Sequence, residues 1–226
     1  MILAAVVSGF ILALVAPLLQ RLLPNRAGWV LSILPLALTV FFASKIPQIN
    51  AGQIINEYHA WVPTLGASLS FYLDGLSLVF SLLICGVGTL IVIYSGGYLS
   101  GHTHLGRFYT FMLLFMASML GLVLAGNLIS LFVFWELTSI SSYFLIGFDH
   151  QREPARTAAL QALLVTGTGG LVLLAGMLLM GWATGSMEIS ELLTRADMIR
   201  GNVLYIPILI LVLLGAFTKS AQVPFH

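Results

Sequence analysis

The sequence carries very little charge. Asp, Glu, Lys and Arg together make up 8% of its 226 residues, whereas a soluble domain has roughly 25%. Nine basic residues against eight acidic ones give a formal net charge of +1, which excludes a basic surface for nucleic acid. With 59% hydrophobic residues and a mean hydropathy of +1.04, the chain lacks the polar shell of a water-soluble fold, so lipid is the expected solvent.

Cysteine and catalytic motifs are also scarce. The single cysteine, Cys85, excludes a disulfide within the chain, a thiolate zinc site and an iron–sulfur cluster. No phosphate loop, dinucleotide fingerprint, zinc-protease helix or nucleophile elbow is present. We therefore expect no metal, no cofactor and no catalytic chemistry in this chain. The absence of these motifs favours a transporter subunit, and any redox reaction would take place in partner subunits.

Long apolar runs are what the sequence has in abundance. A helix needs roughly 17–25 apolar residues to cross a bilayer, and seven runs of about that length occur. They predict an all-α, multi-pass membrane protein with about seven transmembrane helices, the last one broken. The predicted spans are 1–20, 28–46, 75–99, 108–126, 128–148, 158–182 and 203–223.

The segments between the spans contain polar and turn-forming residues. Residues 20–28 and 151–156 are predicted to be short loops in water. Asp74 directly precedes an apolar run and suits a helix N-cap, the structural role we favour for it. The 47–73 connection predicts an interfacial strand or hairpin, and 187–199 a short surface helix.

The distribution of basic residues predicts the orientation, because short cytoplasmic loops hold the excess of Lys and Arg. Five basic residues fall on one side and three on the other, which places the N-terminus outside the cell and the 47–73 and 183–202 connections with it. The expected location is the inner (plasma) membrane. The first group is Arg21, Arg26, Arg107, Arg152 and Arg156, and the second is Lys45, Arg195 and Arg200.

Two ionisable residues lie deep inside apolar spans, Glu136 in the fifth and Lys219 in the seventh. Each costs about 2.5–3.5 kcal/mol at a helix centre on insertion scales, so such residues are read as functional. The alternative is an ion pair that only joins two helices, but buried ion pairs stabilise proteins poorly. The two residues are our candidates for proton transfer.

Polar residues recur at helical spacing near this pair. Ser139 and Tyr143 follow Glu136 at i+3 and i+7, where their hydroxyls could hold the carboxylate or a water. Gln161 and Thr168 lie on one face of the sixth span. Such a stripe fits either helix–helix contact or a hydrated path.

The end of the seventh span contains a helix breaker. Pro224 cannot donate a backbone hydrogen bond and its ring clashes with the carbonyl of Ser220, so a break is expected just after Lys219. Helix breaks at membrane depth occur where they line a cavity or are buried in protein. If the helical phase continued, Gln222 and His226 would share the Lys219 face. His226 suits either a proton relay or an interfacial position.

Three stretches, Tyr72–Leu78, Phe134–Phe148 and Thr218–His226, resemble the antiporter-like subunits of Mrp cation/proton antiporters and respiratory complex I. The residues that follow Glu136 look closer to the large A subunit of Mrp antiporters than to the largest antiporter-like subunit of complex I. The resemblance implies two inverted five-helix repeats, each with a broken helix, and a proton-transferring pair at Glu136 and Lys219.

The resemblance also predicts how the chain is divided into segments. Residues 1–73 would form two N-terminal transmembrane helices and an external loop, and 74–226 would begin the first inverted repeat of a partial antiporter-like fold. Expected partners are other integral membrane subunits, a chain or segment that completes the fold after His226, protons, sodium and lipid, with no nucleic acid.

Three functions remain open from the sequence. The first is proton/cation translocation within a multisubunit sodium/proton antiporter. The second is the proton-pumping module of a redox-driven complex of the complex I or membrane-bound hydrogenase type. The third is a structural membrane protein that transports nothing, although a scaffold would gain little from buried charges.

Overall fold

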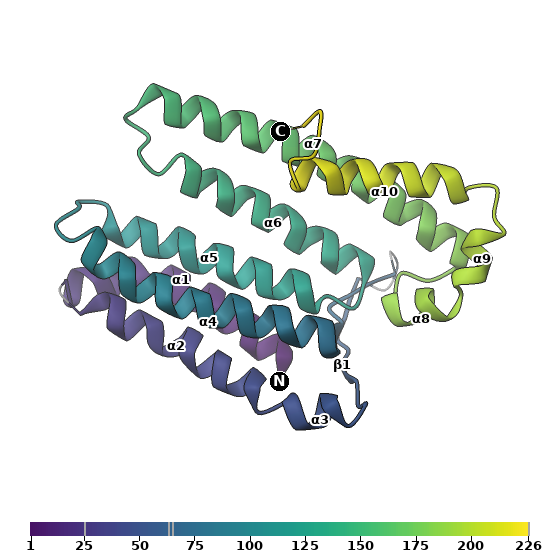
Figure 1. The fold of residues 1–226 in the computed structure, drawn as a ribbon, viewed down its shortest axis with the longest axis horizontal. Helices are drawn as coiled ribbons and strands as arrows, with labels where there is room; N and C mark the ends of the chain where they lie inside the picture. Colours follow the sequence, from purple (N-terminus) through teal and green to yellow (C-terminus); the bar gives the residue numbers. More distant parts are fainter. Residues whose placement is uncertain (25, 63, 65, 226) are drawn as a thin grey trace. The chain divides into compact units, whose positions relative to one another are not determined.

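The computed structural model describes residues 1–24, 26–62, 64 and 66–225, and most of them are helical (Figure 1). Among the described residues, six helices are long and apolar enough to cross a membrane, and α10 is a shorter apolar helix. The prediction of an all-α, multi-pass protein with about seven membrane helices is therefore confirmed.

The chain divides into two compact units. The first comprises residues 1–57 and 71–124, in which α1 packs on α5 and α2 packs on α4. The predicted domain boundary after residue 73 marks where the first inverted repeat would begin, and it stays a prediction. The helices of this unit are α1 (Ile2–Leu22), α2 (Ala27–Ala43), α3 (Ile46–Asn50), α4 (Gly75–Tyr98) and α5 (Leu105–Leu124).

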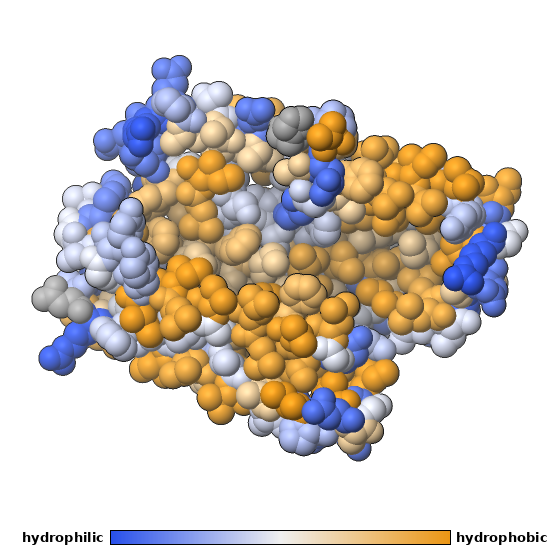
Figure 2. All heavy atoms as spheres, in the orientation of Figure 1, coloured by the Kyte–Doolittle hydropathy of each residue, from blue (hydrophilic) through white to orange (hydrophobic). Residues whose placement is uncertain are grey.

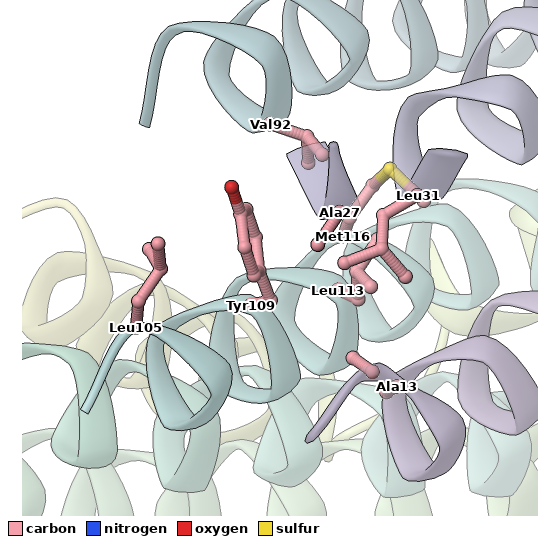
Figure 3. Packing of buried hydrophobic residues seen from close by; sticks show 9 residues of the cluster. Ala13, Ala27, Leu31, Val92, Leu105, Tyr109, Leu113 and Met116 are labelled. Carbon is pink, nitrogen blue, oxygen red and sulfur yellow. The ribbon is translucent and has the colours of Figure 1, made fainter. Parts of the chain in front are cut away.

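The core of the first unit lies along α5, as Figure 3 shows. Tyr109 and Leu113 of α5 are fully buried and lie in one cluster with Leu31 of α2, Val92 of α4 and Ala13 of α1. Small side chains such as Ala13 let membrane helices approach closely, which replaces the hydrophobic driving force that lipid does not provide.

The second unit comprises residues 58–70 and the chain from 125 onward, and α7 is its central helix. Both α6 and α10 pack on α7. With 32 residues, α7 is about 48 Å long, more than the roughly 30 Å of the hydrocarbon core. It must therefore tilt or project into water. The helices are α6 (Leu128–Ile146), α7 (Glu153–Thr184), α8 (Ile189–Thr194), α9 (Ala196–Arg200) and α10 (Tyr205–Lys219).

The start of α7 corrects one predicted boundary. Residues 151–156 were expected to form a loop and the span to begin at 158, but α7 begins at Glu153. Pro154 lies in the first turn, where proline is tolerated because the first N–H groups of a helix have no intrahelical partner. The other predicted spans match helices, and α10 ends at Lys219.

The described residues of the 47–73 connection include four short strands, where a strand or hairpin was expected. In the first unit β1 (Ile55–Glu57) pairs with β4 (Phe71–Leu73) in antiparallel register. In the second unit β2 (Ala60–Val62) pairs with β3 (Ala67–Ser68). The predicted surface helix at 187–199 is present as the two short helices α8 and α9.

Local capping chemistry sets three helix ends. Asp74 caps α4 as expected: its carboxylate accepts from the Ser77 N–H at 2.8 Å, and the Ser77 hydroxyl in turn accepts from the Asp74 N–H. Asn127 caps α6 by accepting from the Ile129 N–H at 2.9 Å. Gly185 ends α7 with a φ of 72°, a left-handed conformation that glycine adopts without a steric penalty.

The surface is apolar over the helices. On the face drawn in Figure 2, hydrophobic side chains cover most of the helical surface and hydrophilic ones gather near helix ends. Large side chains such as Leu14, 79% exposed, and Trp182, 74% exposed, point away from the protein. Exposed apolar area on this scale is expected where lipid or partner proteins surround the helices.

A buried polar network joins the second unit outside its helices. The Glu188 carboxylate accepts from the hydroxyls of Ser68 and Ser70 and from the side-chain amide of Asn127. The Asn127 amide also donates to the Gly66 carbonyl at 3.0 Å. Because Asn127 caps α6 and Glu188 is the N-cap residue of α8, this network ties the 58–70 hairpin to the starts of α6 and α8.

The network predicts a stability difference between two neighbouring glutamates. Glu188→Ala would leave three buried donors without their acceptor, each costing about 1–3 kcal/mol, so the thermal unfolding midpoint in detergent should fall by several degrees. Glu191 makes a half-exposed ion pair with Arg195, and such pairs contribute about 0–1 kcal/mol. Glu191→Ala should therefore leave the midpoint nearly unchanged. Equal midpoints for the two variants would show that the network does not hold the unit together.

Candidate functional site

The candidate site lies where α6, α7 and α10 pack in the second unit. Glu136 is near the middle of α6 and Lys219 is the last residue of α10. Both α6 and α10 contact α7, so the helices that carry Glu136 and Lys219 belong to one three-helix group.

The Lys219 ammonium is bound by two hydroxyls of α6. Its Nζ donates to Oγ1 of Thr138 at 2.7 Å and to Oγ of Ser139 at 2.8 Å. It also lies 5.4 Å from the ring centre of Trp135, within the range of a cation–π interaction. Thr138 and Ser139 are buried. The lysine is thus held by neutral groups.

The Glu136 carboxylate lies against α7. Its Oε1 is buried and has no hydrogen-bond partner among the described residues. A Cβ at Gly170 would overlap with this oxygen, so only glycine leaves the carboxylate its present place. The structure records no direct ion pair between Glu136 and Lys219 within its described part.

The structure brings some of the predicted supporting residues to this group and leaves others apart. Ser139 contacts Lys219 instead of the carboxylate. Tyr143 is half-buried and its ring contacts Phe144. Gln161 is exposed on α7. Thr168 is exposed and lines a hollow of about 410 Å³ together with Thr218 and other side chains of α7 and α10.

The segment after Lys219 leaves the helix. Ser220 is the C-cap of α10, and its hydroxyl donates to the Ala216 carbonyl at 3.0 Å. Gln222 and Pro224 are exposed, and the Gln222 N–H donates to the Phe217 carbonyl. His226, expected to be either a proton relay or an interfacial residue, lies outside the described residues.

Sequence reasoning missed Thr138, Trp135 and Gly170. Thr138 follows Glu136 at i+2, so the i+3 and i+4 rule that selected Ser139 does not reach it. The Thr138 hydroxyl accepts a hydrogen bond from Lys219 of α10, and this contact between two helices can be seen only in the structure. The Gly169–Gly170 pair within an apolar helix was the available signal, because small residues mark close approaches between membrane helices.

Two family models match this chain. One, described as NADH:quinone oxidoreductase/Mrp antiporter, covers residues 125–226, and the other, described as the N-terminus of NADH–ubiquinone oxidoreductase (complex I) chain 5, covers residues 61–109. The first match contains both Glu136 and Lys219. Residues 61–109 and 125–226 thus match the antiporter-like domains that Mrp antiporters and complex I share.

Individual antiporter-like relatives agree with this assignment. The A1 subunit of a Na⁺/H⁺ antiporter from Staphylococcus haemolyticus is 44% identical over 223 residues, and the A subunit of the Na⁺/H⁺ antiporter from Alkalihalophilus pseudofirmus is 43% identical over 224 residues. Each alignment covers 98% of this chain and 28% of the relative. The chain therefore spans little more than a quarter of the length of these curated relatives.

Solved structures of antiporter-like proteins share the fold. An Mrp complex from a Dietzia species matches with a TM-score of 0.88 and 37% identity over 99% of this chain and 24% of the other. Complex I from Thermus thermophilus matches with a TM-score of 0.77 and 22% identity over 100% of this chain and 45% of the other. At that identity the second match shows the fold alone.

The contact between Glu136 and α7 generates a test with two glycines of one helix. Gly170→Ala would push a methyl group into the carboxylate and displace it, so if Glu136 works in transport, cation/proton exchange in vesicles should fall at least tenfold. Gly167 has nothing within 4 Å of its ideal Cβ, and Gly167→Ala should keep the wild-type rate because alanine favours a helix. Wild-type exchange in Gly170→Ala would show that the carboxylate's position is unimportant.

Proposed function

We propose that this chain supplies a proton-transfer element to a multisubunit sodium/proton antiporter. The observation that carries the proposal is the convergence of Glu136 and Lys219 within the apolar group of α6, α7 and α10. An ionisable residue at membrane depth is expensive and typically marks a proton or ion path. The relatives at 43–44% identity are named as components of Na⁺/H⁺ antiporters, which supports sodium and protons as the transported ions.

The pair would act as a switch. When the Glu136 carboxylate is charged and close, it stabilises the Lys219 ammonium; when it is protonated or turns away, that stabilisation is lost. A change in one group therefore changes proton binding at the other. In this scheme a proton reaches one member of the pair and its arrival drives a proton from the other toward the next polar group.

A redox-driven pump is the second candidate. It is supported by the shared fold with complex I and with an archaeal membrane-bound sulfane sulfur reductase at a TM-score of 0.79, both at 22% identity. The higher identity of the antiporter relatives favours the first candidate. A purely structural role is the third, and the two ionisable side chains weigh against it because a charge at membrane depth is costly and a scaffold does not need it.

The partners follow from the proposed assembly. They are other integral membrane subunits of the same complex. The inner (plasma) membrane is the proposed location, with the N-terminus outside, since five basic residues against three distinguish the two sides. No metal or cofactor is needed for the proposed proton transfer.

The proposal predicts the effect of removing either charge. Lys219→Ala and Glu136→Gln should each abolish sodium-driven proton movement, because neither variant retains a switchable pair. The measurement is dye-reported proton movement on sodium addition to inverted vesicles that contain the whole protein with its partners. The amount of each component in the membrane serves as the assembly control. Exchange at wild-type rates in both fully assembled variants would refute the assignment.

The orientation can be tested by cysteine labelling. In a Cys85→Ala background, a cysteine at Gln53 should react with a membrane-impermeant maleimide in intact cells, whereas one at Gln151 should react only after permeabilisation. Both positions are exposed in loops on opposite predicted sides. The reverse labelling pattern would place the N-terminus inside.

A further inference from the structure

The Lys219 ammonium occupies a site made only of neutral groups. Thr138 and Ser139 accept its hydrogen bonds at 2.7 and 2.8 Å, and the Trp135 ring lies 5.4 Å away. A lysine ammonium has three donors. Two of them are used by hydroxyls, and the aromatic ring adds a further interaction with the cation without a formal negative charge.

The hydroxyls are preset to accept. Thr138 donates its own proton to the Trp135 carbonyl at 2.7 Å, and Ser139 donates to the same carbonyl at 3.3 Å. Since each hydroxyl proton is directed at that backbone oxygen, the oxygen lone pairs are left for an incoming donor. Both side chains are buried, so water does not compete strongly for them.

This arrangement differs from what an ion pair alone requires. If Glu136 were the sole partner of Lys219, the ammonium would be stable only while the carboxylate is charged and near. The hydroxyls hold the ammonium at hydrogen-bond distance while Oε1 of Glu136 is without a partner in the described part of the chain. The lysine thus has a resting place that does not depend on a contact with the carboxylate.

We propose that Thr138 and Ser139, with Trp135, form a second seat that binds the Lys219 ammonium when it is separated from Glu136. This inference rests on the proposed function and specifies how its switch is regulated: the lysine moves between a charged partner and a neutral seat. The three residues are positioning residues, since they act on transport only through Lys219. The seat holds the ammonium against α6 until the Glu136 carboxylate is again charged and close enough to pair with it.

The test separates the hydroxyl from the shape of the side chain. Thr138→Val keeps the volume and removes the acceptor, and antiport should fall by about tenfold or more, as expected for a lost hydrogen bond to a charged group. Thr138→Ser keeps the acceptor and removes only a methyl group, so it should retain most of the rate. A structural role would give the opposite order, because the loss of the methyl group would be the more damaging change.

Ser141 provides the matched control. It is buried on the same helix, and its hydroxyl donates only to the backbone carbonyls of Leu137 and Thr138 among the described residues. Ser141→Ala should keep the wild-type rate, whereas Ser139→Ala should lower it. The second pair of variants also carries the test if Thr138→Val does not accumulate in the membrane.

The outcomes distinguish the seat from the function on which it rests. Loss in Thr138→Val and Ser139→Ala with retention in Thr138→Ser and Ser141→Ala supports the seat. Wild-type rates in Thr138→Val and Ser139→Ala, with none in Lys219→Ala, would overturn the seat and leave the proposed function standing. Wild-type rates in Lys219→Ala would overturn the proposed function itself.

Discussion

A charged side chain inside hydrocarbon must find its polar partners within the protein, and the second unit is arranged around this requirement. The Lys219 ammonium donates hydrogen bonds to two hydroxyls on α6. These hydroxyls donate their own protons to a backbone carbonyl of the same helix. The carboxylate of Glu136 is less completely satisfied, with one buried oxygen lacking a partner in the described residues. No fixed set of donors therefore holds this carboxylate in one place, unlike the ammonium.

The three helices approach closely because two residues of α7 at the contacts are glycines, which have no side chain. Adjacent glycines serve two different neighbours: a Cβ at Gly170 would overlap with Glu136 of α6, and one at Gly169 would overlap with Thr218 of α10. Successive residues of a helix point about 100° apart, so the pair opens two faces of one turn. The residue next to Thr218 is Lys219. The packing of α10 on Gly169 therefore also sets the distance over which its lysine reaches α6.

Much of the fold could be predicted from the sequence, because hydropathy and capping chemistry are local. The apolar runs located the membrane helices, and Asp74 before Gly75 located the start of α4. The start of α7 was missed, since Pro154 is compatible with both a loop and a first helical turn. Glu136 and Lys219 could be identified from the sequence because an ionisable side chain inside an apolar span has a high free-energy cost. Their immediate partners did not, because helical spacing on one helix cannot show that Thr138 receives a donor from residue 219, 81 positions later.

The position of Lys219 within its own helix adds a stabilising effect that does not involve α6. With 15 residues, α10 is about 22 Å long, shorter than the roughly 30 Å of hydrocarbon, so a helix that starts at the interface ends inside the membrane. The last carbonyls of a helix lack intrahelical donors and carry the negative end of its dipole. The turn after α10 satisfies two of them, through Ser220 and Gln222. A cation at position 219 benefits from the remaining negative potential, whereas a cation one turn earlier would lose part of this benefit. Where the helix ends therefore matters as much as what its final residue contacts.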